Sequence, residues 1–216
     1  MANFTTHFTV AAGASAAGGL VYWATGSVSA IQALLLAAAG AFGGMLPDID
    51  SDNSRPIRIV SHLVFVILSF FLIQFFKAHS WLELGVLLGI FYLAFHFALV
   101  PTFKKYSAHR GIYHSLLAGL FFAILYIVLT FYFYRSSNTF VWLSGFFVFA
   151  GFVIHLVLDE MYSVDFNNRR LKKSFGTALK LIGKETQNNL IMTAIIIVLL
   201  FLTPPISGFG RLLFFQ

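Results

Sequence analysis

The sequence predicts an all-α membrane protein, a polytopic helical bundle of about seven transmembrane helices with its N-terminus in the cytoplasm. Hydrophobic residues make up 59% of the 216 residues, and charged residues only 10%. A soluble domain carries roughly 25% charged residues. The low charge excludes an ordinary soluble domain and a disordered chain. The absence of Cys excludes a disulfide framework, a zinc ribbon and a thiol nucleophile.

Long stretches without Asp, Glu, Lys or Arg set the number of predicted spans. The first stretch, Phe8–Pro47, can hold two helices of about 20 residues each, which is the length that a bilayer core requires. Each later stretch can hold one helix. We therefore expect spans near residues 9–25, 28–46, 59–77, 82–100, 112–134, 138–159 and 188–204.

The first two spans differ in composition from the later ones. Gly and Ala dominate residues 13–19 and 37–44, whereas Phe, Leu and Ile dominate the later spans. Because small residues let helices approach closely in lipid, we expect the first two helices inside the bundle and the later ones against lipid. The chain has no evident repeat or linker, so residues 1–216 are expected to form a single membrane-embedded domain.

The Lys and Arg residues set the predicted orientation. Loops that hold such residues stay in the cytoplasm, and most of the 14 lie on the side of the N-terminus: Arg55, Arg58, Lys104, Lys105, Arg110, Arg169, Arg170, Lys172, Lys173, Lys180 and Lys184. The net charge of +6 is therefore attributed to topology and to contact with anionic membrane lipid, and no nucleic-acid partner is expected. Residues 171–184 place apolar and Lys side chains on opposite faces of a helix, which predicts an interfacial amphipathic helix. A solvated basic loop is the alternative.

Ionisable residues that are far apart in the sequence are expected at this same cytoplasmic boundary: His7, Asp48, Asp50, Asp52, His62, His109, His114, His155 and Asp159. Such groups are costly at a membrane and are functional candidates by default. Imidazole and carboxylate suit zinc, manganese or iron. His155 and Asp159 are four residues apart and share a helix face. A bound cation would also relieve the repulsion among clustered carboxylates, so the sequence predicts a divalent metal site.

Structural roles stay open beside this hypothesis. Asp48 and Asp50 can cap a helix end, and Asp52 lies in turn-forming SDNS. His155 and Asp159 can form a buried hydrogen bond. The remaining histidines can be surface or interface residues, with His96 a candidate for an interhelical hydrogen bond. Three arginines near the acids, whose forked guanidinium groups fit phosphate oxygens, can instead neutralise the carboxylates: Arg55, Arg58 and Arg110.

The motifs that carry these residues resemble one bacterial family. MANFTTH, LPDIDSDNS, HRGIYHS, HLVLDE and VDFNNRRLKKSFGTALKL look like signatures of the LexA-regulated, membrane-bound metal-dependent hydrolases, and they cover nearly the whole chain. That family is remotely similar to zinc-dependent phospholipase C and related single-strand nucleases. The resemblance implies one to three divalent ions, foremost zinc, and cleavage of phosphoesters.

The ligand order of those soluble enzymes, carried over by the resemblance, is filled here by His7, Asp48, His62, His109 with His114, and His155 with Asp159. The soluble enzymes have a bridging Asp where this chain has Tyr113. Asp50 or Asp52 would take that place, and either one is the candidate general base, with Arg110 stabilising charge on the transferred group. The expected substrate is a membrane-lipid phosphoester. The alternatives are a metal- or proton-coupled transporter and a structural or regulatory protein with a helix-clamping metal.

Overall fold

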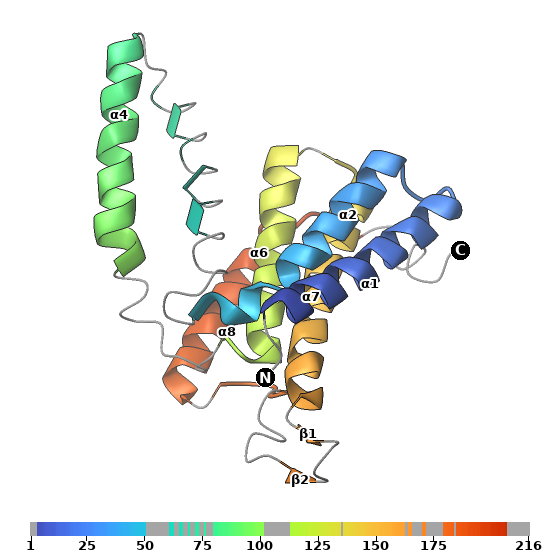
Figure 1. The fold of residues 1–216 in the computed structure, drawn as a ribbon. Helices are drawn as coiled ribbons and strands as arrows, with labels where there is room; N and C mark the ends of the chain where they lie inside the picture. Colours follow the sequence, from blue (N-terminus) through green and yellow to red (C-terminus); the bar gives the residue numbers. More distant parts are fainter. Residues whose placement is uncertain are drawn as a thin grey trace. The chain divides into compact units, whose positions relative to one another are not determined.

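The structure is a computed structural model. It describes residues 4–50, 61–62, 65–66, 69, 72–73, 76, 80–101, 113–134, 136–162, 164–165, 170–171, 179–183 and 185–206. The regular elements among these residues are almost all helical (Figure 1): α1 (Phe4–Ala24), α2 (Ala30–Gly43), the 3-10 helix η1 (Leu46–Asp50), α4 (Trp81–Ala94), the π-helix η2 (Phe95–Leu99), α6 (Leu116–Tyr134), α7 (Asn138–Met161) and α8 (Thr186–Leu200), with the two-residue strands β1 (Val164–Asp165) and β2 (Arg170–Leu171). The predicted all-α class is confirmed.

The chain divides into two compact units where the sequence predicts a single domain. The first unit comprises residues 1–47 and 112–216, and the second comprises residues 48–111. In the second unit, no side chain of α4 is buried.

A tight hairpin joins α1 to α2. Gly26 follows the end of α1 with φ of 71°, a left-handed conformation that glycine adopts at the lowest cost. Ser29 then begins α2 with a capping box. Its hydroxyl accepts the Gln32 amide, and the Gln32 side chain accepts the Ser29 amide. The hairpin sets α1 and α2 side by side.

Small residues let α1 pack closely on α2. The buried residues of α1 form one stripe at helical spacing: His7, Ala11, Ser15, Gly19 and Tyr22. A Cβ built at Gly40 would overlap the Ser15 side chain, and one at Gly44 would overlap the Cβ of Ala11. The small residues thus allow the expected close approach, but α1 does not lie inside the bundle as predicted, because Phe8, Leu20 and Trp23 on its other faces are exposed.

The other side of α2 packs equally closely on α7. A Cβ at Gly151 would overlap the Gly40 carbonyl, and one at Gly43 would overlap the Val148 carbonyl. Glycine at these positions thus brings the backbones of α2 and α7 into contact, as small residues do between membrane helices. Since Gly40 contacts both neighbours, α2 lies between α1 and α7.

α7 is the central helix of the first unit, so the expectation that the later spans face lipid is wrong for this helix. Its fully buried residues include Leu143, Val148, Phe152 and Leu156. α6 packs on another face of α7, where Ile127 occupies the space beside Gly145, and α8 packs on α6. Glycines within an otherwise bulky sequence give α7 close neighbours on more than one face, so its burial does not follow from composition alone.

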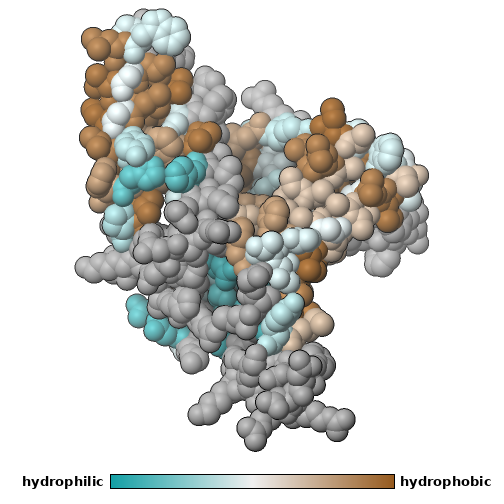
Figure 2. Space-filling model, in the orientation of Figure 1, coloured by the Kyte–Doolittle hydropathy of each residue, from teal (hydrophilic) through white to brown (hydrophobic). Residues whose placement is uncertain are grey.

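The second unit contains α4, η2 and the described residues between 61 and 76, all of which have helical backbone. Phe65 stacks on Phe91, with ring centroids 5.3 Å apart, and contacts Phe95 at 5.4 Å. The face of α4 that is visible in Figure 2 is largely apolar. An unburied apolar helix is typical of contact with lipid.

The described helices overlap the predicted spans, of which the span near residues 59–77 is described only in part, and seven crossings are not established. Four described helical segments are long and apolar enough to cross a membrane: 30–48, 81–99, 116–134 and 138–161. α8 has 15 residues and is shorter than a bilayer core requires. α1 contains many Gly, Ala, Ser and Thr residues, which lower its apolar character.

The prediction of an interfacial helix at residues 171–184 is wrong at both ends of this segment. Arg170–Leu171 pairs with Val164–Asp165 as β2 and β1, and residues 179–183 are not helical. The reason at the second end is that the carbonyls of Lys180 and Leu181 accept amide protons of α6, which a helix would use internally. Residues 172–178 lie outside the described part of the chain.

We expect Gly151→Ala to lower the free energy of unfolding by about 1–3 kcal/mol, since an added methyl must force α7 away from the Gly40 carbonyl. Gly13→Ala in α1 is the matched control, because nothing lies within 4 Å of a Cβ there. The free energy of unfolding of this control should rise by up to about 1 kcal/mol, because Ala has a higher helix propensity than Gly. Unfolding in detergent measures both, and equal stability of the two variants would contradict the packing argument.

Candidate metal centre

His7 enters the site from the first turns of α1. It is the first member of the buried stripe, one helical turn before Ala11. Because Ala11 packs against Gly44 at the end of α2, the next turn of α1 is carried to the same end of the bundle. Only 3% of His7 is exposed, so the stripe that packs α1 also buries its imidazole.

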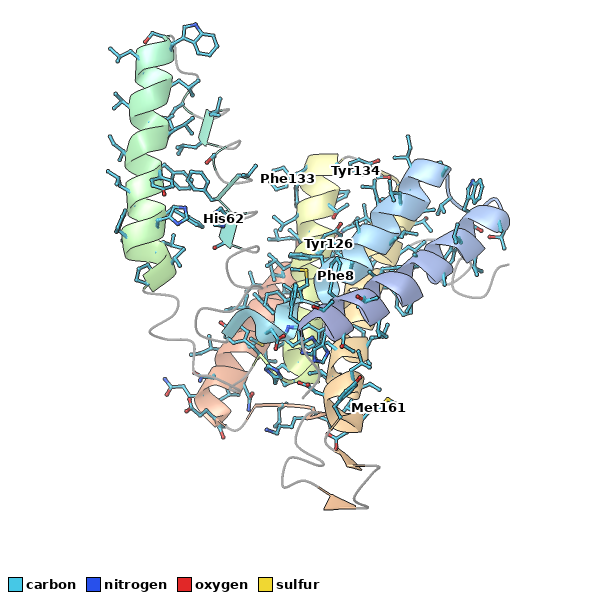
Figure 3. All side chains as sticks on the ribbon, viewed as in Figure 1. Phe8, His62, Tyr126, Phe133, Tyr134 and Met161 are labelled. Carbon is cyan, nitrogen blue, oxygen red and sulfur yellow. The ribbon has the colours of Figure 1, made fainter. Side chains whose placement is uncertain are left out.

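His155 and Asp159 enter from the last turns of α7. His155 follows Gly151 by one turn and is fully buried, and Asp159 is 4% exposed. Met161, labelled in Figure 3, marks the end of α7 two residues after Asp159. The predicted sharing of one helix face is confirmed, with His155 Nε2 lying 3.8 Å from Asp159 Oδ2.

His114 enters from the turn that precedes α6. Ser115 caps this helix, since its hydroxyl accepts the Ala118 amide at 3.3 Å. His114 is 6% exposed, and its Nε2 lies 3.9 Å from Asp159 Oδ2. The site therefore draws on three elements that are far apart in the sequence.

Three imidazoles converge on the single Asp159 carboxylate. His7 Nε2 lies 3.2 Å from Oδ1, and the other two imidazoles approach Oδ2. The His7 and His155 rings stack with their centroids 3.8 Å apart and an angle of 11° between their planes. Within the part of the chain that the structure describes, neither Asp159 oxygen accepts a well-formed hydrogen bond.

The Gly44 carbonyl fixes which nitrogen of His155 faces Asp159. His155 Nδ1 lies 2.7 Å from this oxygen, which can only accept, so Nδ1 carries the proton and donates. In the neutral ring Nε2 then keeps its lone pair, and that lone pair lies near the carboxylate. Two electron-rich atoms so placed in a buried site repel each other unless positive charge balances them. A bound cation provides that charge, as does a second proton on the ring.

The donor spacing fits one metal ion. Ligand atoms around tetrahedral zinc lie about 3.4 Å apart, given bonds of about 2.1 Å. His7 Nε2 lies 3.2 Å from Asp159 Oδ1, and His155 Nε2 lies 3.8 Å from Asp159 Oδ2. These two distances lie on either side of the value for zinc. One donor atom each from His7, His155 and Asp159 lies within 4.8 Å of the others. The His155–Gly44 hydrogen bond is the contact that orients metal-binding imidazoles in proteins.

The structure thus brings together four of the predicted ligands: His7, His114, His155 and Asp159. Asp48 lies in η1, directly after the fully buried Pro47 that ends this segment of the first unit, and is itself half-buried. Asp50 ends η1, and its side chain is not described. Five further predicted site residues lie outside the described residues: Asp52, Arg55, Arg58, His109 and Arg110.

His62 belongs to the second unit, where it lies beside α4 (Figure 3). Its ring centroid is 5.8 Å from that of His96 in η2, and Tyr92 lies 4.5 Å from His96. His62 therefore has an aromatic and imidazole environment within its own unit. Its predicted role as a ligand stays a prediction.

The sequence does not predict the role of the Gly44 carbonyl, which orients His155. A backbone oxygen has no sequence signature of its own. The cluster of Gly40, Gly43 and Gly44 at the end of α2 is the only signal that could have pointed to a close backbone approach there.

Comparison with known proteins identifies the family. No curated protein and no solved structure matches the chain, so the predicted remote similarity to zinc-dependent phospholipase C and single-strand nucleases gains no support. A family model described as YdjM inner membrane protein matches residues 1–204, which include all four clustered site residues. Since this match covers nearly the whole sequence, the chain belongs to the YdjM inner membrane protein family.

Proposed function

We propose that this inner membrane protein is a metal-dependent hydrolase that cleaves a phosphoester of a membrane lipid at the cytoplasmic face. The observation that carries the proposal is the convergence of three buried imidazoles on the Asp159 carboxylate. Two further observations support it. The sequence resembles metal-dependent hydrolases, and the site lies at one end of membrane-length helices.

The proposed ion is held by His7, His155 and Asp159, with His114 beside them. This set of nitrogen and oxygen donors, without sulfur, favours zinc and also suits manganese and iron. When bound, zinc would lower the pKa of a coordinated water to about 7 and so supply a hydroxide at neutral pH. The chain's own residues orient the donors, through the Gly44 carbonyl at His155 and the α1 stripe at His7.

Other predicted residues keep their roles within this proposal. Asp48 is an additional carboxylate donor, as the resemblance of LPDID to the hydrolase motif implies. Asp50 or Asp52 serves as general base. The guanidinium groups of Arg55, Arg58 and Arg110 bind phosphate oxygens, for which their forked geometry is suited.

The substrate class follows from position and charge. His7, His114 and Asp159 lie at helix ends, where a membrane helix meets the headgroup layer. A site at that depth reaches a lipid phosphate without extracting the lipid from the bilayer. The cytoplasmic side is favoured because the sequence predicts most Lys and Arg residues in loops on the side of the N-terminus.

A helix clamp is the second candidate function. The four donor residues are at most 6% exposed, and they come from α1, α7 and the turn before α6. An ion held by them would tie three elements together, as structural zinc sites do. Metal binding is common to both functions, and turnover separates them.

Protein purified without chelators should contain a divalent ion. His155→Gln and His114→Ala remove donors and should weaken its binding at least about tenfold, and Asp48→Ala tests the additional carboxylate. His96→Gln is the matched control, because it removes an imidazole that is not among the four clustered donors. Elemental analysis and competition with a chromophoric chelator measure the binding. Equal metal content in His155→Gln and His96→Gln would overturn the site.

Metal-loaded protein in mixed micelles should release phosphate or a phosphorylated headgroup from membrane lipids. Arg110→Ala should keep its metal and lose about 10²–10³-fold in turnover, as expected for loss of a group that stabilises developing charge. Phosphate release and mass spectrometry of the lipids detect the products. Full metal occupancy without any product from a complete lipid extract would leave the helix clamp as the function.

A further inference from the structure

The turn that carries His114 is held by a segment distant in the sequence. The Leu116 amide donates to the Lys180 carbonyl at 2.8 Å, and the Leu117 amide donates to the Leu181 carbonyl at 3.1 Å. These are the first amides of α6, which have no acceptor within their own helix. The backbone at 180–181 therefore caps α6 two residues after His114.

A single side chain, Asn189 of α8, fastens that segment. Its Oδ1 accepts the Gly183 amide at 2.9 Å, and its Nδ2 donates to the Gly183 carbonyl at 2.8 Å. Asn189 is 9% exposed and Gly183 is also buried. Both hydrogen bonds are therefore sheltered from water, and the low dielectric constant of the interior strengthens them. A carboxamide can accept and donate in this paired way.

The connection from α8 to the candidate site is thus continuous. Asn189 fixes Gly183, the neighbouring carbonyls fix the first turn of α6, and that turn holds His114 with its Nε2 3.9 Å from Asp159 Oδ2. His7 and His155 are held by other means, the α1 stripe and the Gly44 carbonyl. Among the described contacts, the hydrogen bonds of the 180–183 segment reach the turn that carries His114 and not the residues that hold His7 or His155.

We propose that Asn189 is the positioning residue for His114, and that it acts on the metal only through that imidazole. The inference rests on the proposed metal site but concerns a residue that would not touch the ion. Partners that orient ligands in this way typically change metal affinity 10–100-fold. The Asn189 carboxamide acts through its two hydrogen bonds to Gly183, and both are needed to position His114.

The test is a double-mutant cycle on the full chain in detergent. Asn189→Ala should weaken zinc binding about tenfold in the wild-type background and by less than about twofold in the His114→Ala background, where nothing remains to be positioned. Asn188→Ala is the matched control, since Asn188 is its neighbour on α8 and its side chain donates to the exposed Glu185. An equal loss in both backgrounds would overturn the proposal and indicate general loosening of the bundle.

A second measurement is independent of metal. In protein with ring-labelled histidine, Asn189→Ala should shift the NMR signal of His114 and leave those of His7 and His155 in place, with or without zinc. If Asn189→Ala does not fold, Asn189→Asp keeps the acceptor for the Gly183 amide and should give a smaller shift in the same direction. A wild-type protein that binds no zinc yet shows the selective shift would overturn the metal site alone. An unmoved His114 signal would overturn the role of Asn189.

Discussion

The close approach of α1 and α7 to the two sides of α2 is the constraint on which the rest of the first unit depends. Gly40 contacts Ser15 on one side and Gly151 on the other. One helical turn further along, Gly44 meets Ala11 and accepts the hydrogen bond of His155. The candidate site is therefore the next layer of the same interface, where imidazoles replace the small residues.

The environment of Asp159 explains why this layer requires positive charge. A buried carboxylate is costly unless it is paired, and Asp159 lies in the last turn of α7, where the helix dipole disfavours an anion. The start of α6 could have offered free amides, but its first ones are used by the carbonyls of Lys180 and Leu181. The imidazoles, with a cation or with additional protons, are the compensation that the described residues provide.

The sequence predicted much of this arrangement because its strongest signals are local. Uncharged stretches located the helices, and the spacing of His155 and Asp159 placed both on one face. The centrality of α7 was missed, because Gly145 and Gly151 act only through partners on other helices. The 179–183 segment was mistaken for a helix, since its Leu and Lys pattern gives no sign that its carbonyls cap α6. The hydrogen bond between His155 and Gly44 joins residues 111 positions apart, a separation that local patterns do not bridge.

Preorganisation bears on whether an ion here would serve catalysis or only hold helices. Zinc fingers use metal binding to fold, since their small cores cannot do so alone. In this chain α1 and α7 are already fixed against α2 by backbone contacts at glycine, and the donors are carried along at no further cost in backbone entropy. A metal that only holds helices together adds little stability where the helices already pack this closely. The same packing favours a site that binds an ion in a fixed geometry, which is what hydrolysis by a polarised water requires.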